Sequence, residues 1–113
     1  MIKTKRIYDP PEPSDGHRLL IMRRWPRGIK KTAVDGWNPE LGPSLALLRE
    51  YRQGNLDWPT MAQRYRREMQ GRREELAEVA RLAREGDVTL LCSCQDEKRC
   101  HRTLLKELVE GLS

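Results

Sequence analysis

Three cysteines, one histidine and one arginine lie together in a short segment near the end of the chain. Cys92, Cys94 and Cys100 fall within nine residues, and His101 and Arg102 follow directly. A thiolate can act as a nucleophile or a metal ligand, an imidazole can transfer protons or bind a metal, and a guanidinium binds anions. The segment therefore contains the side-chain types of a chemical site.

The first interpretation of this segment is thiol chemistry on an anionic substrate. Cys92 or Cys100 is the nucleophile or redox thiol, His101 transfers protons, and Arg102 holds the anion. The segment follows an apolar run and precedes a helical pattern, so Cys100 is expected at or near a helix N-terminus. The partial positive charge there favours anions and lowers the pKa of a thiol.

Three other interpretations of the same residues stay open. Cys92, Cys94, Cys100 and His101 have the number and types of ligands that a tetrahedral zinc site requires, although the spacing is not the usual paired one. Cys94 and Cys100 are close enough in sequence for a regulatory disulfide. In the last interpretation, Cys92 is only a small buried hydrophobe of a strand, and the following residues only begin a helix.

A second candidate group surrounds a tryptophan. Arg23, Arg24 and Arg27 flank Trp25 in a loop that contains Pro26. Arginine beside an indole is a combination that stacks on bases and binds phosphates. We therefore expect Arg23 and Arg27 to bind the anion, while Trp25 itself is more simply explained as a residue that packs beside the sheet.

The positive charge of the protein is concentrated in its first quarter. The chain has 22 Lys and Arg against 17 Asp and Glu, a net charge of +5, but residues 1–31 carry +6 and the remainder −1. Such a segment suits nucleic-acid phosphate, a small anion or an acidic partner, or is only a solvated face. A nucleic-acid-binding module that uses this basic quarter is therefore the alternative function, and it predicts salt-dependent affinity.

The elements that position these residues can be predicted from hydropathy patterns. Residues 2–6 alternate and predict an edge strand, while the apolar runs 18–22 and 88–92 predict buried strands. Helical patterns cover residues 43–54, then 57–86 as one long helix or two abutting ones, and finally the segment that starts near Cys100. Residues 29–42 show no periodicity and are expected to be irregular.

Strands separated by helices pair in parallel, because a hairpin requires a short turn. The predicted fold is a small α/β domain with a mostly parallel open sheet and packed helices in two or three layers. In such a sheet the loops 23–28 and 92–102 leave the same edge, where open α/β sheets bind their ligands. We expect the two candidate groups to meet there.

Length and composition limit the remaining possibilities. A chain of 113 residues and 13.3 kDa suits one domain, here residues 1–113. Hydrophobic residues make up 37% and charged residues 35%, and no apolar run is long enough to span a membrane. Three clustered cysteines do not form a disulfide framework, so a reducing, cytoplasmic location is expected.

Several motifs together resemble one family. They are Asp15-Gly16-His17-Arg18, Trp25-Pro26-Arg27-Gly28, and Thr89-Leu90-Leu91-Cys92 with Cys100-His101-Arg102. Through these motifs the chain resembles the bacterial and archaeal family known as domain of unknown function 488. The resemblance extends from residue 6 to the last helix. The resemblance implies a small cytoplasmic α/β domain and supplies no reaction.

Overall fold

A four-stranded sheet and four α-helices make up the fold, which we describe from a computed structural model for residues 1–112. The strands are β1 (Ile2–Arg6), β2 (His17–Leu20), β3 (Gly36–Trp37) and β4 (Val88–Cys92). The helices are α1 (Leu45–Arg52), α2 (Trp58–Met69), α3 (Arg73–Glu85) and α4 (His101–Glu110). None of the helices within residues 1–112 is long and apolar enough to cross a membrane.

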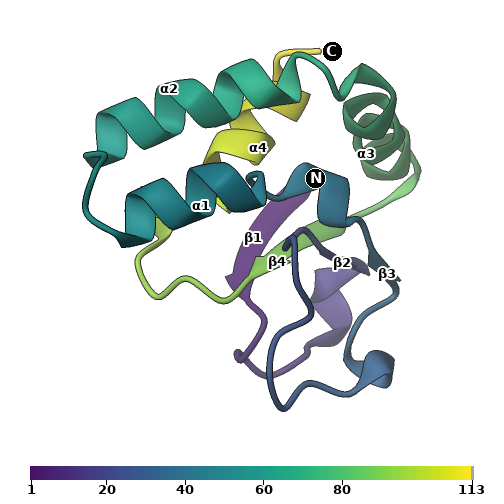
Figure 1. The fold of residues 1–113 in the computed structure, drawn as a ribbon. Helices are drawn as coiled ribbons and strands as arrows, with labels where there is room; N and C mark the ends of the chain where they lie inside the picture. The colour runs from purple at the N-terminus through teal and green to yellow at the C-terminus, as the bar shows by residue number, and fades with distance from the viewer. Residues whose placement is uncertain (113) are drawn as a thin grey trace.

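All four strands are parallel and lie in the order β1-β4-β2-β3 (Figure 1). Val88 at the start of β4 pairs with Ile2 on one side and with His17 on the other. All five residues of β4 are buried, as expected for a central strand with both faces covered. The predicted parallel α/β fold, with residues 2–6 as an edge strand, is therefore confirmed.

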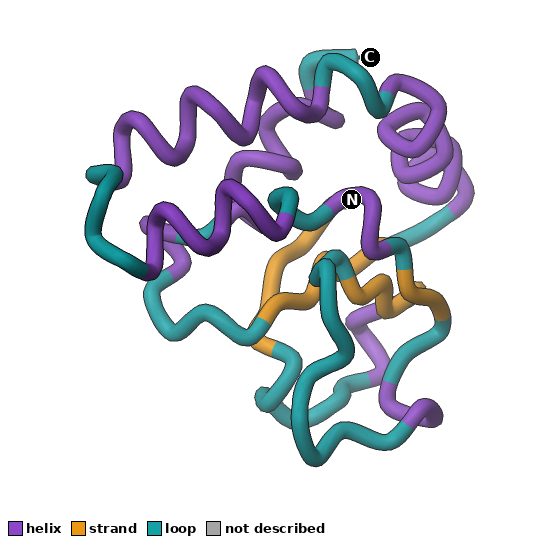
Figure 2. Tube along the Cα trace, viewed as in Figure 1, coloured by secondary structure: helices purple, strands orange, loops and turns teal. Residues whose placement is uncertain are grey.

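Helices cover one face of the sheet and irregular chain covers the other (Figures 1 and 2). The main core packs all four helices against residues such as Leu19 and Leu90. Leu20 and Leu91 point to the opposite face and pack against Met22, Trp25 and other residues of the loop after β2. The fold thus has one layer of helices on one layer of strands.

The long helical pattern over residues 57–86 is two abutting helices. The α2 helix begins at an Asp57 N-cap, whose side chain accepts a hydrogen bond from the Thr60 amide, and ends at Met69. After a turn that contains Gly71, α3 begins at Arg73. Gly weakens a helix by about 1 kcal/mol relative to Ala, which favours an interruption there.

Ser44 sets the start of α1, the helix that will form one wall of the site. Its hydroxyl accepts a hydrogen bond from the Leu47 amide at 3.2 Å and donates one to the carboxylate of Glu68. The Ser44 amide donates to the same carboxylate at 2.9 Å. The side chain therefore joins α1 to α2 as well as capping it.

We expect Ser44→Ala to lower the free energy of unfolding by about 1 kcal/mol, because the N-cap acceptor is lost. Urea denaturation followed by circular dichroism measures this change. Ser14→Ala is the matched control, since the Ser14 hydroxyl makes no hydrogen bond within residues 1–112, and its effect stays within about 0.5 kcal/mol. Equal effects of the two substitutions would contradict the capping role.

A buried ionic group joins β1, β2 and β4 at the amino end of the sheet. Asp15 is 2% exposed and accepts hydrogen bonds from Arg18 and from Lys5, the latter at 3.1 Å. Thr89 of β4 donates to the Asp15 carbonyl at 2.7 Å. Burial raises the pKa of Asp15, but the Glu12 amide and the two cations outweigh it and hold that pKa below its usual value of 3.8.

Candidate functional site

The three sulfurs and the imidazole meet at the carboxyl edge of the sheet. Cys92 ends β4, Cys94 lies two residues later, Cys100 is the N-cap of α4, and His101 is its first residue. The three sulfurs and a ring nitrogen lie within 4.8 Å of one another. Cys92 Sγ is 3.5 Å from Cys94 Sγ and 3.7 Å from His101 Nδ1. The structure thus brings together the residues that the sequence placed in one segment.

His101 has a defined orientation. Its Nε2 lies 2.6 Å from the carbonyl oxygen of Ile21, just after β2. Because a carbonyl only accepts, we assign the proton to Nε2, which leaves the lone pair of Nδ1 directed at Cys92 and Cys100. The ring of Tyr65 packs edge-on against the imidazole at 5.5 Å. Nδ1 is therefore free to accept a proton or bind a metal.

Arg102 lies behind the sulfurs. It is 3% exposed, and its Nη1 donates to the Cys94 carbonyl at 2.9 Å and to Cys100 Sγ at 3.6 Å. Among residues 1–112, Arg102 has no carboxylate partner, and its buried Nε has no hydrogen-bond partner. The guanidinium thus holds the loop after β4 and contributes an uncompensated buried positive charge to the cluster.

The pKa values of Cys92 and Cys100 shift in opposite directions. Hydrogen bonds from the Cys100 and Cys94 thiols, with the charge of Arg102, lower the pKa of Cys92 despite its burial. The same contacts with Cys92 and Cys94, together with burial, raise the pKa of Cys100. Cys92 therefore ionises more readily than Cys100.

A cavity of about 320 Å³ opens onto this cluster. Its walls come mainly from the residues just after β2, from α1 and from the loop after β4. The residues that line it are Met22, Arg23, Arg24, Pro43, Leu45, Leu48, Arg49, Arg52, Gln53, Cys92, Ser93, Cys94 and His101. Four arginines and no acidic residue line the cavity within the described part of the chain, so its lining favours an anion.

Three of these arginines have free guanidinium groups. Within residues 1–112, the side chains of Arg24, Arg49 and Arg52 make no hydrogen bond or ion pair. Arg23 is different, because it donates to the Gly42 carbonyl at 3.0 Å and pairs with Glu40 at 3.3 Å. Arg23 therefore fixes the wall of the cavity, while the other three are available to a ligand.

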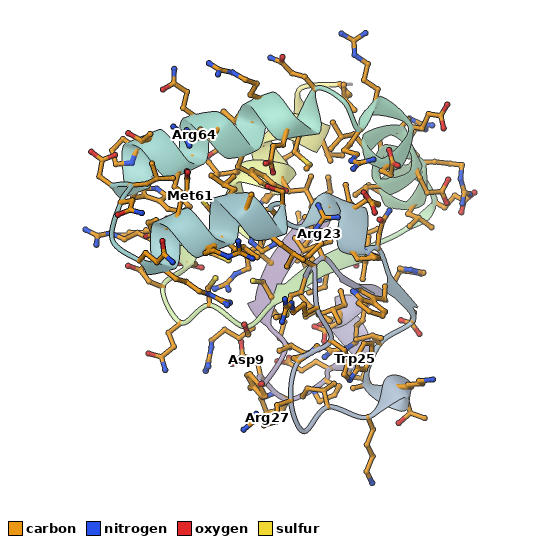
Figure 3. All side chains as sticks on the ribbon, viewed as in Figure 1. Asp9, Arg23, Trp25, Arg27, Met61 and Arg64 are labelled. Atoms are coloured by element: carbon orange, nitrogen blue, oxygen red, sulfur yellow. The ribbon has the colours of Figure 1, made fainter. Side chains whose placement is uncertain are left out.

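Arg27 does not reach the cavity. Figure 3 shows it near Asp9, at the far end of the loop from Arg23. The Arg27 side chain is exposed, and its carbonyl accepts a hydrogen bond from Tyr8 Oη at 3.1 Å. Of the three residues predicted to bind the anion, only Arg23 lines the cavity, since Arg102 lies behind it.

Trp25 explains why Arg27 points away. The Trp25 indole donates to the Ile29 carbonyl at 2.8 Å and packs edge-on against Trp37 at 5.3 Å. This anchors the loop to the face of the sheet opposite the helices, and Gly28 turns it with a φ of +79°. The packing role expected for Trp25 is the one observed.

Arg49 and Arg52 are the cavity arginines that the sequence did not indicate as functional. Their spacing places them on one helix face with Leu45 and Leu48, which is a detectable pattern. The pattern does not predict that this helix face lies toward the carboxyl edge of the sheet. A larger hollow of about 480 Å³ lies between α2, α3 and α4, but it shares no lining residue with the sulfur cluster.

Comparison with known proteins gives relatives of unassigned role. A family model described as the active DUF488-N3 subclade matches residues 2–112. The uncharacterised protein YeaO of Escherichia coli is 37% identical over 98% of both chains. Uncharacterised proteins of Mycobacterium bovis and Mycobacterium tuberculosis are each 30% identical, over 97% of this chain and 94% of theirs. No solved structure gives a significant match.

Proposed function

The chain belongs to the DUF488 family, and from this premise we propose that it binds a small anionic ligand at the carboxyl edge of its sheet. One observation carries the proposal: the cavity beside the sulfur cluster is lined by four arginines and, among residues 1–112, by no acid. A volume of about 320 Å³ suits a small phosphorylated molecule, since ligand pockets measure roughly 300–1,000 Å³.

The free guanidinium groups of Arg24, Arg49 and Arg52 supply the anion contacts under this proposal. Arginine binds carboxylate and phosphate through two parallel hydrogen bonds, which gives orientation as well as affinity. Leu45 and Leu48 between them provide an apolar wall for the rest of the ligand. The ligand would therefore lie with its charge toward α1 and the Arg24 loop.

Cys92 and His101 are buried residues that line the cavity, so they would face the bound ligand. Cys100 does not line the cavity. The roles of Cys92 and Cys100 as nucleophile or redox thiol, and of His101 in proton transfer, stay predictions.

The nucleic-acid alternative has less support from the distribution of charge. Of the nine cations in residues 1–31, four pair with acidic side chains, which reduces the free positive charge of this segment. The pairs are Lys3–Asp87, Lys5–Asp15, Arg18–Asp15 and Arg23–Glu40. The nucleic-acid alternative therefore rests on the five other cations of this segment, one of which, Arg24, also lines the cavity.

We expect Arg49→Gln and Arg52→Gln each to weaken the binding of phenyl phosphate by about tenfold, and the double variant by about 100-fold. A hydrogen bond to a charged group contributes about 1.5–3 kcal/mol, which gives this range. Isothermal titration with phenyl phosphate and with inorganic phosphate measures the affinities at fixed salt.

Arg67→Gln is the matched control, because Arg67 is an exposed helical arginine outside the cavity, and its variant binds like the original protein. Absence of phosphate binding, or equal binding by the double variant, would overturn the proposal. Tighter, salt-sensitive binding of a single-stranded oligonucleotide that the double variant retains would support the nucleic-acid function instead.

A further inference from the structure

The cysteine and histidine cluster carries an inference that does not depend on the anion proposal. We propose that Cys92, Cys94, Cys100 and His101 bind one zinc ion through three sulfurs and Nδ1. The site lies at the inner end of the cavity and extends behind it, since Cys100 is not a cavity residue. Its ligands come from the end of β4, the following loop and the start of α4.

The distances between the candidate ligand atoms fit a tetrahedral ion. Zinc bonds of about 2.3 Å to sulfur and about 2.0–2.1 Å to nitrogen give tetrahedral edges of about 3.8 Å between sulfurs and about 3.6 Å from sulfur to nitrogen. In the structure, Cys92 Sγ and Cys94 Sγ are 3.5 Å apart. His101 Nδ1 lies 3.7 Å from Cys92 Sγ and 4.0 Å from Cys100 Sγ. All four ligand atoms lie within 4.8 Å of one another, so side-chain shifts of about 1 Å bring them to the separations of a tetrahedral zinc site.

The hydrogen bond of His101 is the one that a metal-bound histidine makes. A zinc-binding imidazole donates its other ring N–H to a carbonyl or carboxylate, which fixes the tautomer and the ring orientation. Here Nε2 donates to the Ile21 carbonyl at 2.6 Å. The lone pair of Nδ1 is therefore directed into the sulfur cluster before any ion arrives.

The buried charge of Arg102 supplies an independent argument. Three thiolates around a dication carry a net charge of −1, and Arg102 donates to Cys100 Sγ and to the Cys94 carbonyl beside them. No described acidic side chain pairs with this arginine. A metal site with three thiolates therefore places its net negative charge beside a buried cation that has no carboxylate partner.

The donor set selects the metal and the role. Three thiolates and one imidazole suit zinc and do not suit magnesium or calcium, which prefer oxygen. Four protein ligands leave no open position, as in structural zinc sites. The ion would join β4 to α4 across the loop 93–99 and form a rigid inner end of the cavity. It would also leave no free thiolate for nucleophilic or disulfide chemistry.

Metal analysis of freshly purified protein without chelator is the first test. We expect close to one zinc per chain, and we expect the metal-free protein to bind one Co²⁺ with the visible absorption of a tetrahedral site and thiolate-to-cobalt charge transfer. Iodoacetamide is expected to label the half-buried Cys94 only after chelation, since Cys92 and Cys100 are buried with or without the metal.

Two variants test the ligands while keeping a polar side chain at each position. Cys94→Ser changes a half-buried loop residue, and His101→Gln keeps an amide in place of the Nε2 donor. Each is expected to weaken Co²⁺ binding at least about 100-fold, since loss of an outer partner alone costs roughly 10- to 100-fold. Ser93→Ala is the matched control and is expected to keep full metal binding.

The inference is overturned if fresh protein holds no zinc and Co²⁺ gives no tetrahedral spectrum. It is equally overturned if mass spectrometry finds a Cys94–Cys100 disulfide, or if iodoacetamide labels Cys92 at once in untreated protein. The Arg49→Gln, Arg52→Gln double variant separates the two proposals: it should lose phosphate affinity and retain the metal, whereas Cys94→Ser should lose the metal.

Discussion

Asp15→Asn is expected to lower the free energy of unfolding by about 3–5 kcal/mol. The carboxylate is buried and pairs with Arg18, whose side chain is also buried, and with Lys5. Removing one partner of a buried ion pair leaves the other charge without compensation, which is why the cost is large. Urea denaturation at neutral pH measures it.

The same ion pair predicts a dependence on pH. The pKa of Asp15 is lower in the folded protein than its usual value of 3.8, so the folded state favours the ionised form. The contribution of Asp15 is therefore complete well above pH 3.8 and is lost as the pH falls through the lower, folded pKa. The difference between the original protein and Asp15→Asn should shrink in that acidic range.

Glu50→Gln provides the control for an exposed ion pair. Glu50 pairs with Arg64 at the surface, at 2.6 Å, and such pairs contribute about 0–1 kcal/mol. If Asp15→Asn destabilises the protein no more than Glu50→Gln does, the buried group is not the stabilising feature that its geometry indicates.

Tyr65→Ala is expected to destabilise the protein by about 3–5 kcal/mol, the cost of removing a large buried aromatic side chain. Tyr65 is completely buried in the main core, and its hydroxyl donates to the Leu41 carbonyl at 2.7 Å. Tyr65→Phe should cost about 1–2 kcal/mol, because it leaves the buried carbonyl without a donor. Thermal and urea unfolding of both variants measure these effects.

Tyr65 also packs against the ring of His101, so its removal should reach the site. We expect Tyr65→Ala to weaken Co²⁺ binding as well as stability, whereas Tyr65→Phe should keep metal binding because the ring remains. Tyr8→Phe is the control: Tyr8 is 48% exposed and donates an exposed hydrogen bond to Arg27. A Tyr65→Phe variant as stable as Tyr8→Phe would contradict the role of the buried hydroxyl.

The central strands could be predicted because they are contiguous apolar runs in the sequence. The strand predicted at residues 88–92 has the bounds observed for β4, because β-branched and apolar residues fill the whole buried strand. The strand β3 could not be found, since two residues, Gly36 and Trp37, show no period. Trp37 is 44% exposed, and its indole donates a hydrogen bond to the Met22 carbonyl just after β2.

The site was predictable where neighbours in sequence are neighbours in space. Cys92, Cys100 and His101 meet because one strand, one loop and one helix start connect them. Arg27 and Arg49 show the opposite case. Both lie far in sequence from the cysteines, and only the path of the loop and the rotation of α1 decide that Arg49, not Arg27, lines the cavity.

The strand order has a consequence for how the chain reaches its native state. The strand β4 pairs with β1 on one side and with β2 on the other. The sheet is therefore complete only when residues 88–92 are in place. During synthesis, β1 has no sheet partner, and β2 has only the two-residue strand β3, until the last quarter of the chain emerges. Pairings between residues so distant in sequence fold slowly. The newly made protein therefore passes through a long interval in which its strand edges are exposed to aggregation.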